Sequence, residues 1–272
     1  MSDFKDIKIV LCDVDGTLLN DDGNVLEETV QAIKKLRNKG ILFGLCTGRD
    51  LHSVKELSEK WGIKQYIDVI VGTGGSEICD FVKGIEKTVY PLEGEFIKEI
   101  MTHYEDLDVN FVIPSEGILH VPKDDEHIRL LAKVDGVPYK VVDFNEFLKV
   151  PRQKVMIMST PEIIECVIEK SKTFKSEKYK SASLKTASVL YEYMDPRISK
   201  TYGIQQILDL HNFSMDNLCA FGDADNDYDM IKNAGIGVVM ENGSELTKSV
   251  ADFITKDNNN NGIGEFLEKN II

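Results

Sequence analysis

The sequence predicts an α/β fold in which a parallel-sheet core carries an inserted α+β domain. Short apolar runs alternate with stretches of helical spacing at both ends of the 272-residue chain, which is the pattern of a sheet covered by helices. The middle of the chain instead holds longer strand candidates in which apolar and polar residues alternate more regularly. A chain of this length accommodates one or two domains.

The first half of the predicted core begins at the apolar run 8–12, which we expect to form a buried strand. Helical spacing follows over 27–39 and stops at Gly40, a residue type that commonly ends helices. The next predicted elements, in order, are strand 41–46, helix 51–61 and strand 66–71. Strands and helices therefore alternate as βαβαβ, the order that joins parallel strands through helical crossovers.

The second half of the predicted core lies at the other end of the chain. Its elements are helix 199–210, strand 218–221, helix 227–234 and strand 237–240. Between the two halves, the predicted strands are 110–121, 154–159 and 183–191, and the predicted helices are 124–133 and 161–174. We therefore predict a core domain of residues 1–82 and 192–272 and an inserted α+β domain of residues 83–191. The run 258–261 is interpreted as a turn.

Charge and composition limit the classes of function. The formal net charge of −14 argues against a nucleic-acid partner or an anionic membrane, because both require basic patches. No stretch reaches the roughly 18 uncharged apolar residues of a membrane span, and the charged N-terminal run offers no signal-peptide core. The five cysteines show no CxxC spacing, so we expect a cytoplasmic protein without a zinc site. Cys12, Cys46 and Cys219 lie in apolar runs and are expected to be buried thiols.

Polar residues follow several of the predicted core strands. Asp13 and Asp15 follow the strand 8–12, Thr47 and Gly48 follow the strand 41–46, and the sequence GDADND occupies residues 222–227 after the strand 218–221. In an open parallel sheet, ligands bind outside the carboxyl ends of the strands, near the point where the strand order reverses. We therefore expect these residues to meet in one crevice.

The charges of that crevice indicate what it binds. Asp13, Asp15, Asp223 and Asp227 would bring up to four negative charges together, and two such charges about 4 Å apart cost roughly 4 kcal/mol at an effective dielectric constant near 20. A hard divalent cation with oxygen ligands resolves this repulsion, and Mg²⁺ typically takes one or two carboxylates while keeping waters and a substrate phosphate. A nearby lysine would also help.

These residues carry a resemblance to a known family. The sequence DVDGTLL at 13–19, CTGRD at 46–50, Lys200 at a predicted helix start and GDADNDYDM at 222–230 resemble the four ordered motifs of the haloacid dehalogenase superfamily. Over essentially its full length the chain is similar to the Cof-type sugar-phosphate phosphatases of that superfamily. The resemblance implies a Mg²⁺-dependent phosphatase with a Rossmann-like core and an inserted cap. In one departure, Gly74 stands where many relatives have asparagine, which removes any polar contact of that side chain.

The resemblance also implies roles for single residues. Asp13 would be the nucleophile that forms an aspartyl-phosphate, and Asp15 the general acid and base. The side chains of Asp13 and Asp223 and the backbone carbonyl of Asp15 would hold Mg²⁺. The residues expected to contact phosphate oxygens are Thr47, Gly48, Lys200 and Asn226. Asp227 would orient Lys200 or a metal-bound water.

Other functions are weighed against this one. A phosphomutase of the same superfamily would use the same aspartates, and a non-catalytic sensor of a phosphate ligand would use an inactive version of the fold. Asp223, Asp225 and Asp227 imitate the start of an EF-hand loop, but Tyr228 replaces the required glycine. The expected substrate is a small phosphorylated metabolite, whose identity the sequence leaves open together with the oligomeric state.

Overall fold

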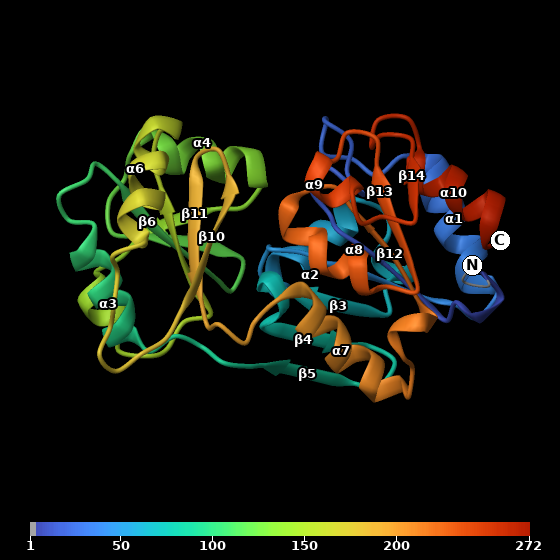
Figure 1. The fold of residues 1–272 in the computed structure, drawn as a ribbon, viewed down its shortest axis with the longest axis horizontal. Coiled ribbons are helices and arrows are strands. Elements are labelled where there is room, and N and C mark those ends of the chain that lie inside the picture. Colours follow the sequence, from blue (N-terminus) through green and yellow to red (C-terminus); the bar gives the residue numbers. More distant parts are fainter. Residues whose placement is uncertain (1–3) are drawn as a thin grey trace. The chain divides into compact units, whose positions relative to one another are not determined.

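The computed structural model describes residues 4–272, which form two units. One unit holds the described part of Met1–Lys87 together with Ser199–Ile272, and the other holds Thr88–Ile198 (Figure 1). The sequence analysis placed these boundaries at 82/83 and 191/192. The first unit is thus built from both ends of the chain, and the second from one continuous segment.

An eight-stranded sheet forms the centre of the first unit. Its strands are β1 (Ile9–Cys12), β2 (Leu42–Cys46), β3 (Val69–Gly72), β4 (Glu77–Asp80), β5 (Ile85–Thr88), β12 (Leu218–Gly222), β13 (Ile236–Met240) and β14 (Phe253–Thr255). Their order across the sheet is β14-β13-β12-β1-β2-β3-β4-β5. The pairs from β14 to β3 are parallel, and β4 is antiparallel to β3. All residues of β1, β12 and β13 are buried, as the continuous apolar runs of central parallel strands require.

The strand order reverses at β1. From β1 the chain adds β2 and β3 on one side, and after the second unit it returns to add β12, β13 and β14 on the other side. The carboxyl ends of β1, β2 and β12 are therefore neighbours at the topological switch point of the sheet. This is the edge at which the sequence analysis expects the crevice.

Helices cover both faces of this sheet. They are α1 (Glu27–Asn38), α2 (Leu51–Lys60), α7 (Lys200–His211), α8 (Tyr228–Asn233), α9 (Glu245–Lys248) and α10 (Gly262–Asn270). On one face, apolar residues of α7 and α8 pack on alternate residues of the strands, such as Leu218 and Ala220. On the other face, Phe266 of α10 packs against Phe221 with ring centroids 5.5 Å apart, and α10 lies beside α1 (Figure 1). The first unit is a three-layer α/β/α structure, which confirms the predicted fold class of the core.

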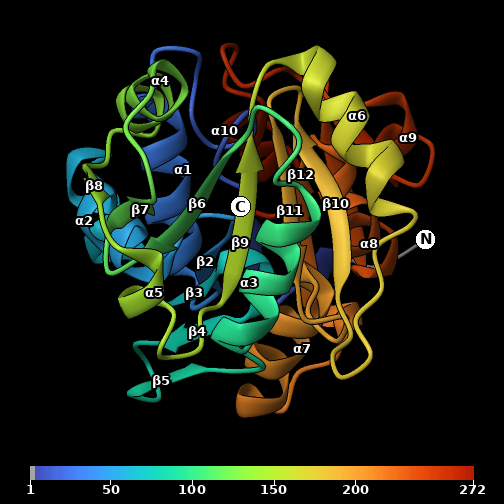
Figure 2. The ribbon, with the colours of Figure 1, turned by 90° about the vertical axis from the view of Figure 1, so that its left-hand side faces the viewer.

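The second unit contains a six-stranded sheet with the order β10-β11-β9-β6-β7-β8 (Figure 2). Its strands are β6 (Asn110–Ser115), β7 (Ile118–Val121), β8 (Tyr139–Val141), β9 (Lys154–Met158), β10 (Ala182–Ala187) and β11 (Leu190–Met194). Its helices are α3 (Gly94–His103), α4 (Glu126–Asp135), α5 (Phe144–Phe147) and α6 (Pro161–Ser171). The helices α3 and α6 pack on one face of the sheet, and α4 packs on the other. This is an α+β unit with its own apolar core.

Two of the predicted strands in this unit were wrong. The stretch 110–121 forms the hairpin β6–β7 rather than one strand, and its two-residue turn places Glu116 and Gly117 at φ 55° and 77°. Positive φ at both positions is typical of a type I′ turn, which glutamate rarely enters, so the turn carried only a weak signal. The stretch 183–191 likewise spans parts of β10 and β11, which pair from Ala182↔Met194 to Ala187↔Leu190.

No helix in residues 4–272 is long and apolar enough to cross a membrane. The five cysteines are free thiols, and Cys12, Cys46 and Cys219 are buried as predicted.

Candidate active site

The predicted site residues of the core do follow neighbouring strands. Asp13 follows β1 and its N–H donates to the carbonyl of Phe221 in β12 at 2.9 Å. Thr47 follows β2, and Asp223 follows β12. Since these three strands are adjacent in the sheet, their ends bring Asp13, Thr47 and Asp223 to one place.

Lys200 is the first residue of α7 and lies buried between two carboxylates. Its Nζ donates to Oδ1 of Asp13 at 2.5 Å and to Oδ1 of Asp227 at 2.5 Å. The exposed fractions are 5% for Lys200, 6% for Asp13 and 0% for Asp227. Ser199 caps α7 by accepting a hydrogen bond from the N–H of Tyr202 at 3.1 Å, which fixes where the helix begins and so where Lys200 projects.

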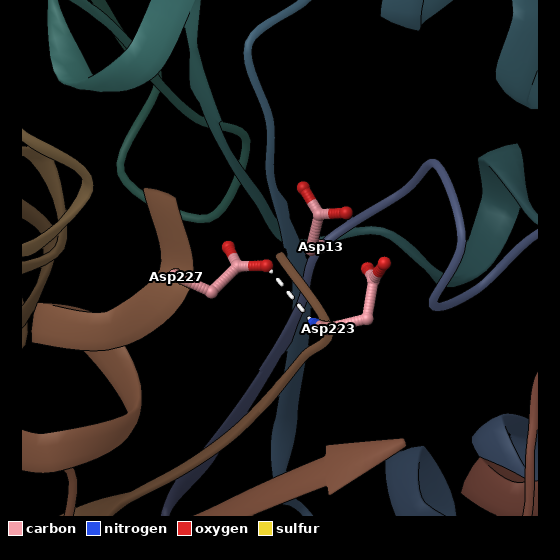
Figure 3. A group of neighbouring side chains, drawn as sticks. All are labelled: Asp13, Asp223 and Asp227. Atoms are coloured by element: carbon pink, nitrogen blue, oxygen red, sulfur yellow. Dashed lines mark hydrogen bonds between the residues drawn. The ribbon is translucent and has the colours of Figure 1, made fainter. Parts of the chain in front are cut away.

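Asp227 also shapes the loop that carries Asp223. Its Oδ2 accepts hydrogen bonds from the N–H groups of Asp223 at 3.0 Å and Ala224 at 3.1 Å, the first of which is drawn in Figure 3. Both Asp227 oxygens therefore already accept hydrogen bonds. Asp227 thus contacts both Lys200 and the loop that carries Asp223, and its role in orienting Lys200 stays a prediction.

Asp223 contacts the loop after β1. Its Oδ1 accepts a hydrogen bond from Thr17 Oγ1 at 2.6 Å, and a Cβ added to Gly16 would lie only 2.5 Å from its Oδ2. Gly16 has φ 82°, so both the conformation and the close approach require glycine. The DGT sequence that opens this loop brings the backbone directly against the Asp223 carboxylate.

The electrostatics of the cluster favour a cation. Burial, together with the neighbouring carboxylates of Asp227 and Asp223, raises the pKa of Asp13 well above its ordinary value despite Lys200. Burial also raises the pKa of Asp223 to about 6. Burial alone would lower the pKa of Lys200, but its contacts with Asp13 and Asp227 outweigh that effect and raise it well above the ordinary value. The three carboxylates of the cluster carry more negative charge, when ionised, than its one lysine neutralises.

The donor atoms fit a hard divalent cation. One carboxylate oxygen from each of Asp13, Asp223 and Asp227 lies within 4.8 Å of the others (Figure 3). Because both oxygens of Asp227 accept hydrogen bonds from other groups, Asp13 and Asp223 are the better ligands. In addition, Oδ1 of Asn226 is buried without a hydrogen-bond partner, which is unusual for a polar side-chain atom. The chemistry of these donors is that of an oxygen-liganded metal site.

Asp15 and Arg49 form a pair that the sequence analysis missed. The Arg49 guanidinium donates to both carboxylate oxygens of Asp15, from Nε to Oδ2 at 2.8 Å and from Nη2 to Oδ1 at 2.8 Å. The Asp15 side chain is 54% exposed and that of Arg49 12%. Arg49 lies in the quoted CTGRD sequence, yet its position after a strand does not reveal its partner, which comes from another strand end.

Thr47 and the loop after β3 are tied together. Thr47 is 1% exposed, and its carbonyl accepts a hydrogen bond from the N–H of Gly74 at 2.9 Å. Gly74 has φ 65°, a conformation that glycine and asparagine adopt most readily. A Cβ on Gly75 would lie 2.0 Å from the carbonyl oxygen of Ser199, so this loop packs directly against the start of α7. The glycines bring Thr47 and Lys200 to the same end of the sheet, while the phosphate contacts of Thr47 and Gly48 stay predictions.

The sequence matches a family of known enzymes. Residues 10–267 match the model of the haloacid dehalogenase-like hydrolases. A 5-amino-6-(5-phospho-D-ribitylamino)uracil phosphatase of Bacillus subtilis is 26% identical over 263 residues, which cover 96% of each chain.

Solved structures show a similar fold. A haloacid dehalogenase-like hydrolase from Bacteroides thetaiotaomicron has a TM-score of 0.86 at 21% identity, covering 97% of this chain and 99% of that one. A Thermotoga maritima protein has a TM-score of 0.81 at 25% identity and covers 97% of both chains. The similarity therefore extends through both units.

Proposed function

Because the chain belongs to the haloacid dehalogenase-like hydrolases, we propose that it is a Mg²⁺-dependent phosphatase that hydrolyses small phosphomonoesters through an aspartyl-phosphate on Asp13. The observation that carries this proposal is the buried Lys200, hydrogen-bonded to both Asp13 and Asp227, with Asp223 beside them. A nucleophilic carboxylate, a fixed cation and a carboxylate pair for a metal are what phosphoryl transfer requires.

In the first step, Asp13 attacks phosphorus and the alkoxide leaves. Lys200 lies 2.5 Å from Oδ1 of Asp13, so its charge adjoins both the attacking oxygen and the phosphate oxygens that approach it. Thr47 and the N–H of Gly48 would donate to phosphate oxygens from the adjacent strand end. The Nδ2 group of Asn226 would donate to a phosphate oxygen as well.

Asp15 would transfer the protons that the two steps require. In its protonated form Asp15 would give its proton to the leaving oxygen, and the resulting carboxylate would afterwards take a proton from the water that hydrolyses the acyl-phosphate. Its carboxylate is bound by Arg49 in the structure, so an approaching substrate must draw Arg49 away. A phosphate dianion is a suitable competitor, because guanidinium groups bind phosphate in the same forked geometry as carboxylate.

Asp13, Asp223 and the backbone carbonyl of Asp15 would hold Mg²⁺. The ion, when bound, would neutralise charge on the transferring phosphoryl group and stabilise the ionised form of Asp13.

For substrate class, we propose small phosphorylated sugars or polyols. The Bacillus subtilis relative acts, by its name, on a phosphorylated ribityl compound. The unit Thr88–Ile198 lies in the sequence between Thr47 and Lys200, and we propose that it is the cap that selects among substrates and excludes water.

The test is a phosphatase screen with purified wild type and Asp13→Asn. The wild type should hydrolyse sugar phosphates in the presence of Mg²⁺ and lose activity in excess chelator. Asp13→Asn should lose several orders of magnitude in kcat while its circular dichroism spectrum stays unchanged, because an amide cannot form the acyl-phosphate. Activity of Asp13→Asn at the wild-type level would refute the mechanism, and bisphosphate-dependent isomerisation of a sugar phosphate would indicate a phosphomutase instead.

A further inference from the structure

Two asparagine side chains hold the loop that carries Asp15. Asn242 follows β13, and its Nδ2 donates to the backbone carbonyl of Gly16 at 2.8 Å. Asn258 follows β14, and its Nδ2 donates to the backbone carbonyl of Leu19 at 2.8 Å. These bonds join the C-terminal strand ends to the loop after β1.

The two asparagines are also joined to each other. The N–H of Asn258 donates to Oδ1 of Asn242 at 3.3 Å. Asn258 is 6% exposed, so water does not readily replace its hydrogen bonds. The side-chain Nδ2 of each asparagine thus donates to the loop, and the side-chain Oδ1 of Asn242 connects Asn242 to Asn258. Asn258 lies in the run that the sequence analysis interpreted only as a turn.

The held loop is short and closed on itself. The N–H groups of Leu18 and Leu19 both donate to the carbonyl of Val14 at 3.0 Å, and Asp15 forms an isolated β-bridge with Leu19. Asp15 therefore directly precedes Gly16, whose carbonyl Asn242 holds, and pairs with Leu19, whose carbonyl Asn258 holds. A shift of either carbonyl would move its backbone.

The same loop lies against Asp223. Gly16 packs on that carboxylate, and Thr17 donates to it at 2.6 Å. The hydrogen bond from Asn242 to the Gly16 carbonyl restrains the residue that packs on Asp223. The two asparagines therefore restrain the loop at the point where it meets the acidic cluster.

We propose that Asn242 and Asn258 are positioning residues that fix Asp15 for proton transfer to the leaving group. The inference rests on the proposed function, because it requires Asp15 to be the proton donor. The asparagines act through the backbone carbonyls of the loop. Proton transfer needs hydrogen-bond geometry, and a displacement of about 1 Å costs roughly 100-fold in rate.

The variants Asn242→Asp and Asn258→Asp test this. Each keeps the shape of the side chain but cannot donate to a carbonyl. Asn258→Asp also puts a carboxylate oxygen where Nδ2 now lies 3.3 Å from Oδ1 of Asp21. The matched control is Asn233→Asp at the exposed end of α8. This variant adds the same charge and removes the hydrogen bond that Nδ2 of Asn233 donates to the backbone carbonyl of Asp229 at 2.7 Å.

The kinetic measurement compares an alkyl phosphate with p-nitrophenyl phosphate, whose leaving group scarcely needs a proton. For Asn242→Asp and Asn258→Asp we expect kcat to fall about 10- to 100-fold on the alkyl ester and less than about 3-fold on the nitrophenyl ester. Asn233→Asp should match the wild type on both. Equal losses on the two esters, or no loss on either, would overturn the inference. Asn242 is exposed, so its variant keeps the test decisive if Asn258→Asp does not fold.

A second measurement does not depend on activity. Hydrogen exchange at the amides of Leu18 and Leu19 should be at least about tenfold faster in the two loop variants than in the wild type or Asn233→Asp. Unchanged exchange would show that the asparagines do not hold the loop. If the wild type lacks phosphatase activity that depends on Asp13, the proposed function fails and the role in proton transfer fails with it, whereas the exchange rates still decide whether the loop is held.

Discussion

At the scale of single residues, the candidate site has one buried lysine among three clustered carboxylates. Lys200 contacts Asp13 and Asp227, and Asp223 completes the acidic group. One positive charge does not neutralise three carboxylates. Burial, together with the neighbouring carboxylates, raises the pKa of Asp13 and of Asp223.

Replacing Lys200 by methionine should impair both activity and folding. The change leaves Asp13 and Asp227 buried without their cation, and removing one partner of a buried ion pair typically costs about 3–5 kcal/mol. Under the proposed function Lys200 would contact phosphate before and during transfer, so we expect KM to rise and kcat to fall. Urea unfolding and steady-state kinetics measure the two effects. Lys256→Met, which breaks the exposed pair with Glu265, is the control and should change stability by less than about 1 kcal/mol. Wild-type stability and KM in Lys200→Met would contradict the assigned position.

Mg²⁺ binding should weaken as the pH falls below about 6. Asp223 has a pKa of about 6 without metal, so above that pH the carboxylate is ionised and ready to bind. Below it, the cation must displace a proton, and the dissociation constant should rise by up to about tenfold per pH unit. The pKa of Asp13 is raised as well, which acts in the same direction. Titration calorimetry at pH 7.5 and pH 5 checks this, and a dissociation constant that stays constant over this range would argue against these carboxylates as ligands.

At the scale of elements, the second unit contains an ion pair inside its sheet. Lys154 of β9 donates to Glu192 of the neighbouring strand β11 at 3.0 Å, with side chains only 3% and 8% exposed. Thr186 of β10 donates to the other Glu192 oxygen at 3.0 Å. Three adjacent strands are thus joined by polar bonds on a face that also carries Met156. Such a pair favours one strand register, because a slip by one residue separates the charges.

Removing one charge of this ion pair should lower the free energy of unfolding more than replacing both residues by apolar ones. Glu192→Gln leaves a buried lysine charge and should lower the free energy of unfolding by about 3–5 kcal/mol, whereas Lys154→Met combined with Glu192→Leu should recover most of that loss. Urea denaturation measures both. Glu165→Gln, which breaks an exposed pair with Lys185 in the same unit, should cost less than about 1 kcal/mol. If the double variant is the less stable one, the pair itself is stabilising and this prediction is wrong.

The elements also show how far the sequence could be interpreted. The central strands were predictable because β1 and β12 are buried on both sides and therefore continuously apolar. Asp13, Thr47 and Asp223 could be brought together because parallel strand ends share one edge, whereas Lys200 was identified only through the family resemblance. The β6–β7 hairpin was missed because its turn places Glu116 in a conformation that glutamate rarely adopts. The Arg49–Asp15 pair and the bonds of Asn242 and Asn258 were missed because they join residues far apart in the chain, and no spacing rule predicts them.

At the scale of the whole molecule, the two units differ in how the chain builds them. The unit Thr88–Ile198 is continuous and has its own core, in which Phe96, Ile157 and Tyr193 are buried. The other unit needs both chain ends, because β12, β13 and β14 complete the sheet that begins with β1. Its folding must therefore wait for contacts between distant segments.

The segment 88–198 should fold by itself, and the segment 1–87 should not. The first keeps all six strands of its sheet, whereas the second lacks β12 beside β1, which would leave the central strand as an exposed edge. Expressed alone, 88–198 should unfold cooperatively in urea and disperse its amide NMR signals. The segment 1–87 should show neither property until it is mixed with 199–272. A non-cooperative transition in 88–198 would show that its core depends on the rest of the chain.

The distribution of the thiols gives this protein a built-in labelling site. Cys166 lies exposed on α6, whereas Cys12, Cys46, Cys79 and Cys219 are buried. Burial raises the pKa of Cys46 and of Cys219, which suppresses the thiolate that reacts with maleimides. A maleimide fluorophore should therefore attach at one position of the native wild-type chain, inside the unit Thr88–Ile198. Its emission would report on the surroundings of α6 without any cysteine having to be introduced or removed.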